Sequence, residues 1–142
     1  MACELCDGDG GEVLWRDGRC RVVQVDEPGY PGFCRVIWSA HVKEMTDLAE
    51  EDRAHFMGVV LAVEATLREL LDPDKVNLAS LGNMTPHLHW HVVARFRGDP
   101  HFPNAIWSAP LRPPPATGVR PGVAALRDGL AQRLSLPGTR NS

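Results

Sequence analysis

The sequence predicts an α+β fold, an antiparallel sheet with one long helix packed on it, followed by a C-terminal extension. Three observations support this class. Short apolar runs typical of strands fill residues 13–38, an amphipathic helix pattern follows from residue 46, and two more strand-like runs come before residue 97. The length of 142 residues suits one domain with one core.

The first three predicted strands precede the helix. The segment "VLWRDGRCRVVQV" contains two strand-like runs around Asp17-Gly18, a dipeptide typical of a tight hairpin. A turn-rich segment, "DEPGYPG", leads into a third run, "FCRVIW", at residues 33–38. These three strands are adjacent in sequence, and we expect them to be neighbours in the sheet.

The long helix is predicted from one apolar stripe with steps of three and four residues. Its members are Phe56, Val59, Val60, Val63, Leu67 and Leu70. Thr46 or Asp47 is suited to cap its start, and the segment "LLDPD" ends it. A helix of this kind covers one face of the sheet.

The chain after the helix contains two further strand-like runs, "VNLASL" and "HLHWHVVARF", and its composition then changes. Residues 108–122 are too rich in proline for a central strand or helix and predict an extended strap. A short helix follows, with Val123, Leu126, Leu130 and Leu134 at helical spacing. We therefore expect a domain over residues 1–108 and an extension over 109–142 that packs on the same domain or on a dimer partner.

Composition and charge limit the partners. The net charge is −3, which predicts no nucleic-acid polymer as a partner, and no apolar run is long enough to span a membrane. No leader opens the chain, so we expect a cytoplasmic protein whose four cysteines are thiols or metal ligands. Cys20 and Cys34 lie in strands and are expected to be small buried side chains.

The strongest motif is the alternation of three histidines in "HLHWHVV". Side chains alternate along a strand, so His87, His89 and His91 share one face while the apolar residues between them face the core. Three interpretations are open. The face is simply solvated, or a His-x-His pair binds a metal with His41 or His101 as third ligand, or a neutral imidazole acts as a nucleophile.

The segment from His87 to Val93 resembles the signature of the histidine triad (HIT) family, in which three histidines alternate with apolar residues. The context agrees, because "CRVIWSAHVKEMTDL" leads into a helix and then into "VNLASLGNMTPHLHWHVVARF". The resemblance covers residues 3–107. It implies a HIT-like α+β fold, a homodimer formed through the helix and an adjacent strand, and a nucleotide hydrolase or transferase that needs no cofactor for its chemistry.

The resemblance also implies a role for each histidine. His89 corresponds to the family nucleophile, which forms a covalent nucleotidyl-imidazole intermediate. His91 corresponds to the residue that contacts the phosphate or leaving group, and His87 to the one whose backbone carbonyl orients the nucleophile. The expected substrate is a nucleotide with a cleavable 5′-phosphoryl bond, such as diadenosine tetraphosphate or a nucleoside phosphoramidate.

Three more residues are candidates for substrate binding by the same resemblance. Asn83 stands where many relatives carry a glutamine that binds phosphate, Thr85 is a second polar candidate, and Asp26 lies near an acid that binds ribose hydroxyls in relatives. One departure is Phe33, at a position where many relatives have a histidine. It leaves open an alternative, a nucleotide-binding or interaction module with little turnover.

The motif "CELC" raises the question of a structural zinc. Some members of the superfamily bind zinc through two cysteines and two histidines, and the matching positions here are Cys3, Cys6, His41 and His87. A tetrahedral Cys₂His₂ set is an established structural zinc arrangement. Arg95 and Arg97 follow the triad strand, and His101 and Trp107 are expected at the rim of the pocket, where they can stack on a base.

Overall fold

The computed structural model describes residues 2–115 and 120–134 and confirms the α+β class. Nine elements follow in chain order: α1 (Glu4–Asp7), β1 (Glu12–Arg16), β2 (Cys20–Gln24), β3 (Phe33–Trp38), the short 3₁₀ helix η1 (Met45–Asp47), α2 (Glu50–Leu71), β4 (Lys75–Ala79), β5 (His89–Arg95) and α3 (Val123–Arg133). The five strands form one antiparallel sheet in the order β1-β2-β3-β5-β4. The triad strand β5 therefore lies inside the sheet, and β4 lies at its edge.

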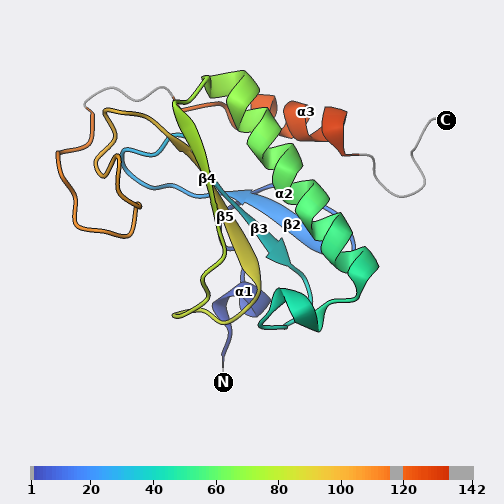
Figure 1. Ribbon diagram of the computed structural model, residues 1–142. Coiled ribbons are helices and arrows are strands. Elements are labelled where there is room, and N and C mark those ends of the chain that lie inside the picture. The colour runs from blue at the N-terminus through green and yellow to red at the C-terminus, as the bar shows by residue number, and fades with distance from the viewer. Residues whose placement is uncertain (1, 116–119, 135–142) are drawn as a thin grey trace.

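The helix α2 crosses one face of the sheet, as predicted, and α3 lies beside it (Figure 1). The core between them is made of alternate strand residues and the apolar stripe of α2, including Val22, Val36, Val92, Phe56 and Val60. Burial of such side chains is the main stabilising term for a domain of this size. Leu70, which was assigned to the stripe, lies outside it and is 38% exposed.

The start of α2 differs from the prediction. The helix begins at Glu50 with Ala49 as its N-cap, whereas Thr46 and Asp47 belong to η1. The Asp47 carboxylate accepts the backbone N–H of Glu44 and closes this turn on itself. This local hydrogen bond engages the Asp47 side chain, which therefore does not cap α2. The chain is extended at Leu48 before the long helix starts.

The strand β5 also begins later than expected, at His89. His87 and Leu88 lie just before the regular strand. The backbone of Leu88 is nevertheless hydrogen-bonded through both its carbonyl and its N–H. Its carbonyl accepts the Trp38 N–H at 3.1 Å, and its own N–H donates to Val42 at 2.8 Å. These bonds keep the alternation intact, so Leu88 faces the core and His87 faces away from it.

The short helix of the C-terminal extension is confirmed over Val123–Arg133, where it packs on α2 and β1 of the same chain. Leu126 and Leu130 are buried in the core. Gly129 permits a close approach, because an added Cβ would lie 2.6 Å from Cγ2 of Thr66 on α2. Residues 116–119 of the strap and the predicted helix end after Leu134 lie outside the described residues. No helix in the described part of the chain is long and apolar enough to cross a membrane.

Candidate functional site

The candidate site is built on the sheet face that α2 leaves uncovered. His89 and His91 point to this face from β5, and both are almost fully buried, with exposed fractions of 7% and 6%. Their rings meet edge to face, with centroids 4.9 Å apart. The neighbouring strand contributes Phe33, Arg35 and Ile37 to the same face, because these residues pair with Val93, His91 and His89.

The orientation of His89 is fixed by backbone. Its Nδ1 lies 2.6 Å from the carbonyl oxygen of His87. A carbonyl only accepts, so Nδ1 carries the hydrogen and Nε2 is left with its lone pair. Burial lowers the pKa of His89, although the bond to His87 opposes the shift. The ring is therefore held as a neutral imidazole with a free nucleophilic nitrogen.

His91 has an apolar and aromatic environment. Its ring lies 4.8 Å from the Trp107 ring and 5.9 Å from the Phe33 ring, both measured between centroids. Burial, with smaller contributions from His89 and Arg35, lowers the pKa of His91 to about 4. Its Nδ1 is buried and has no hydrogen-bond partner among the described residues.

The loop that carries Trp107 is attached to β5 by a buried ion pair. Arg95 donates to both carboxylate oxygens of Asp99, at 2.8 and 3.0 Å, and also to Asn77 and to the Asn104 carbonyl. Asp99 in turn accepts backbone N–H groups of its own loop. Arg95, which appeared in the sequence as a charged strand end, is thus a structural centre of this loop.

His101 does not reach the triad. Its Nδ1 contacts the Tyr30 hydroxyl, and the two rings stack. His101 and Trp107 were both predicted at the rim of the pocket. Of these two, only Trp107 lies beside the triad, and half of its surface is exposed. Arg97 pairs with Asp74 at the surface.

Arg35 was not identified from the sequence. It is the direct cross-strand partner of His91, and its guanidinium lies 5.9 Å from the centroid of the Phe33 ring. Its Nε is buried without a hydrogen-bond partner among the described residues. The only available signal was its place in the apolar run "FCRVIW", where an arginine interrupts a buried strand.

The predicted binding residues lie in different surroundings. Asn83 is exposed in the loop before the triad, and the Thr85 hydroxyl donates to Glu4 on α1 at 3.1 Å. The highly exposed Asp26 forms an ion pair with Arg120 at 2.6 Å. Thr85 thus contacts α1, and Asp26 contacts Arg120 of the strap.

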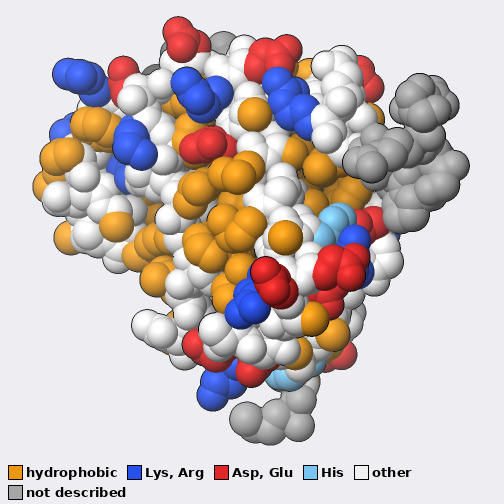
Figure 2. Space-filling view, turned by 45° about the vertical axis from the view of Figure 1, so that its right-hand side comes forward, with side chains coloured by type: hydrophobic (Ala, Val, Ile, Leu, Met, Phe, Trp, Pro, Cys, Tyr) orange, Lys and Arg blue, Asp and Glu red, His pale blue; other side chains and the backbone are white. Residues whose placement is uncertain are grey.

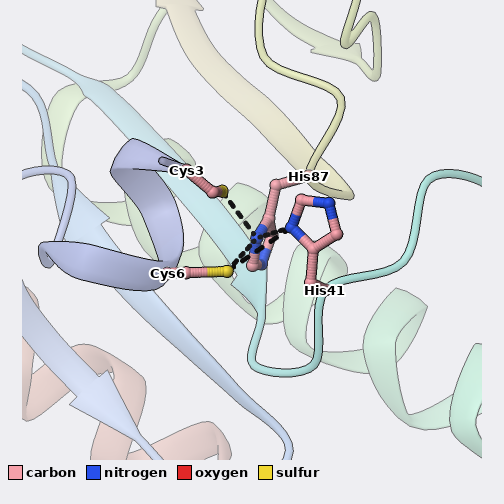
Figure 3. Close-up of side chains that lie close together, drawn as sticks. All are labelled: Cys3, Cys6, His41 and His87. Carbon is pink, nitrogen blue, oxygen red and sulfur yellow. Dashed lines mark hydrogen bonds between the residues drawn. The ribbon is translucent and has the colours of Figure 1, made fainter. Parts of the chain in front are cut away.

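The four residues predicted for zinc come together into one cluster (Figure 3). Cys3 and Cys6 lie at α1, His41 follows β3, and His87 precedes β5. The Nδ1 of His87 lies 3.4 Å from each sulfur and 3.3 Å from the Nδ1 of His41. Tetrahedral zinc, with bonds of about 2.0–2.3 Å, sets its ligand atoms about 3.3–3.8 Å apart. The donor set and its spacing fit such an ion.

The other nitrogen of His87 supports this arrangement. Its Nε2 donates to the Trp38 carbonyl at 2.6 Å, which leaves Nδ1 unprotonated and directed at the cluster. Metal-binding histidines commonly have this second hydrogen bond. Because both ring nitrogens of His87 are engaged, the residue is not available for a His-x-His chelate with His89.

A second group of potential ligands was missed by the sequence analysis. Asp17, Cys20 and His55 lie together where the β1–β2 turn meets α2. The Asp17 carboxylate accepts two backbone N–H groups of its turn and contacts His55 Nε2 at 2.7 Å. Burial raises the pKa of the Cys20 thiol well above its usual range. The group therefore joins the hairpin to the helix through a neutral thiol and a satisfied carboxylate.

Comparison with known proteins identifies the family. The HIT domain model matches residues 10–98, which is more than half of the chain. The chain belongs to the HIT domain family. Solved structures of HIT proteins share the fold, including a histidine triad protein from Marinobacter aquaeolei (25% identity, TM-score 0.74, covering 94% of this chain and 98% of that one). Another, from Bradyrhizobium japonicum, has 25% identity and a TM-score of 0.70 over 88% of this chain and 91% of its own.

Two further HIT relatives bear on the chemistry. A zinc-bound histidine triad family protein from Mycobacterium smegmatis is 26% identical, with a TM-score of 0.66 over 93% of this chain and 95% of its own. An AP-4-A phosphorylase from Mycobacterium tuberculosis is 27% identical over 92 residues, covering 61% of this chain. The HIT chain described here spans about half the length (47%) of that curated relative.

Proposed function

We propose that this HIT protein cleaves a nucleoside 5′-phosphoryl bond, in a dinucleoside polyphosphate such as diadenosine tetraphosphate or in a nucleoside phosphoramidate, through a covalent nucleotidyl-His89 intermediate. The observation that carries the proposal is the 2.6 Å contact between His89 Nδ1 and the His87 carbonyl. It points the lone pair of Nε2 into the site. The family match and the similarity to an AP-4-A phosphorylase support the substrate class.

The reaction takes two steps. The Nε2 lone pair of His89 attacks the α-phosphorus, and the bond from phosphorus to the leaving oxygen or nitrogen breaks with its electron pair on the leaving group. A leaving nitrogen takes up a proton from solvent and departs as a neutral amine. Water then attacks the same phosphorus, the phosphorus–nitrogen bond breaks, and the imidazole regains its lone pair as a proton passes to solvent. His91, neutral at pH 7, contacts the phosphoryl group through its unpaired Nδ1. Asn83, Thr85 and Asp26 remain proposed substrate contacts, for phosphate, phosphate and ribose respectively.

The test replaces His89 with Ala. We expect turnover to fall by roughly 10³-fold or more, because no covalent intermediate can form, while adenosine monophosphate binds with an affinity within a few-fold of wild type. Trapping of radiolabelled adenylyl-enzyme gives a direct readout, and His55→Ala, at a histidine far along the chain from the triad, is the matched control. Wild-type turnover in the His89 variant would exclude the mechanism.

We also propose that Cys3, Cys6, His41 and His87 hold a structural zinc. The spacing of the four ligand atoms supports this, as does the zinc-bound HIT relative. A bound zinc would join α1 to the start of β5 and steady the His87 backbone. The chemistry itself is assigned to His89 and His91 without a cofactor.

We propose that the chain forms a homodimer. Support comes from the face that carries α2, where hydrophobic side chains gather into a patch between charged groups (Figure 2). Leu61 of α2 is 49% exposed, and the neighbouring strand β4 is the edge of the sheet. Unpaired strand edges and exposed apolar helix faces are typical of surfaces through which protein chains associate. The cytoplasmic location stays a prediction.

A further inference from the structure

Arg35 is a half-buried cation beside the triad, and it forms no ion pair with the described residues. It pairs directly with His91 across β3 and β5, so both side chains lie on the same face of the sheet. Its Nε is buried without a partner among residues 2–115 and 120–134. A buried donor left unpaired costs stability, and such a donor in a native protein points to a missing partner such as a ligand.

The other guanidinium groups on this face are used by the fold. Arg95, four residues after His91 on β5, is bonded to Asp99, Asn77 and Asn104. Arg21, on β2, donates to the backbone carbonyls of Leu5, Gly8 and Asp9 and so holds the segment around α1. Arg35 differs from both, because its Nε has no hydrogen-bond partner among the described residues.

The ligand is expected to be an anion. Arg35 is the direct cross-strand partner of His91, so it supplies a formal positive charge on the sheet face that carries His89 and His91. A guanidinium is weakly hydrated and forms two parallel bonds with phosphate oxygens, which suits a partly dry site. Its position next to His91, the residue assigned to the phosphate or the leaving group, puts it on the leaving-group side of the site in the proposed mechanism.

We propose that Arg35 forms a phosphate subsite that holds the part of the substrate beyond the scissile bond and selects polyphosphate leaving groups over uncharged amines. The inference rests on the proposed function, since the leaving group is defined by attack of His89. In a dinucleoside polyphosphate the leaving group carries several negative charges, whereas the amine that leaves a phosphoramidate carries none. Arg35 thus acts on one substrate class and not on the other.

The kinetic test compares two substrates in Arg35→Gln. We expect kcat/KM for diadenosine tetraphosphate to fall by about 10- to 100-fold, the usual effect of losing a hydrogen bond to a charged group. For adenosine phosphoramidate, kcat/KM stays within about threefold, because its leaving group never touches the arginine. Arg35→Lys, which keeps the charge but not the planar fork, restores part of the loss. An equal fall for both substrates would overturn the proposal, since a structural defect or a contact to the shared nucleotide would do that.

A binding test keeps the proposal independent of turnover. In the His89→Ala background, Arg35→Gln should weaken diadenosine tetraphosphate by about tenfold or more, measured by calorimetry, and leave adenosine monophosphate nearly unchanged. Equal affinities with and without Arg35 would refute the subsite. If the proposed function is wrong but the subsite is right, the wild type forms no adenylyl-enzyme, yet Arg35→Gln still weakens the binding of diadenosine tetraphosphate.

Discussion

His89 and His91 lie two residues apart on one strand, yet their surroundings give them different properties. His89 is held by the backbone of His87, which fixes its tautomer and direction. His91 lies among aromatic rings, and its Nδ1 has no described partner. At the scale of single residues, hydrogen bonding therefore distinguishes His89, the proposed nucleophile, from His91, the proposed phosphate contact.

Trp107 is the residue whose contribution is simplest to isolate. We expect Trp107→Ala to raise KM for adenine nucleotides by about tenfold with little change in kcat, because a base stacked on an indole loses that contact in ground and transition state alike. Trp107→Phe should retain most of the affinity. Leu111→Ala, at a similarly exposed position of the same loop (53%), is the control and should behave like wild type. A large loss of kcat in Trp107→Ala would instead indicate that the indole positions His91.

At the scale of elements, the loop after β5 is what brings Trp107 back over the sheet. Its anchor is the Arg95–Asp99 pair, whose side chains are only 2% and 1% exposed. Burial alone would raise the pKa of Asp99, but the Arg95 guanidinium and three backbone N–H groups outweigh it and lower the pKa to about 2. The same bonds that stabilise the carboxylate fix the loop.

This pair predicts a pH dependence of stability. Since the pKa of Asp99 is lower in the folded chain than its reference value of 3.8, the pair stabilises the fold fully above about pH 4 and progressively less as the pH falls towards 2. The expected loss is about 2 kcal/mol of unfolding free energy. Urea denaturation of wild type and Asp99→Asn at pH 5, 3 and 2 checks it, because both proteins contain the same metal-binding residues. The variant should be less stable at pH 5, and the difference should shrink at acid pH. Parallel curves would contradict the assignment.

At the scale of the whole molecule, the cluster of Cys3, Cys6, His41 and His87 links three segments distant in sequence. The link runs from α1 to the end of β3 and the start of β5. His87 belongs to this cluster and, through its carbonyl, also fixes the ring of His89. The proposed metal site and the orientation of the proposed nucleophile therefore share one residue.

Removal of the metal should therefore affect folding and activity together. We expect one zinc per chain in wild type and none in Cys6→Ser, with a melting temperature lower by on the order of 10 °C and a reduced kcat. Elemental analysis and thermal unfolding measure the two effects, and Cys20→Ala, which also removes a thiol, should keep its zinc. Loss of all turnover at an unchanged melting temperature would favour a metal-dependent hydrolase instead.

Much of this protein follows from local sequence. The alternation of "HLHWHVV" determines which side chains face the core and which face the site, and the spacing from Phe56 to Leu67 determines a helix with one buried side, because both patterns depend only on backbone periodicity. Tertiary structure decided the rest. Arg35 and His91, and Arg95 and Asn104, meet through pairing and loop closure, which no local pattern encodes. Thr46 and Asp47 became part of a separate turn, closed by the Asp47 carboxylate. A short polar side chain can bond either a helix start or a local turn, and the surrounding chain selects between the two.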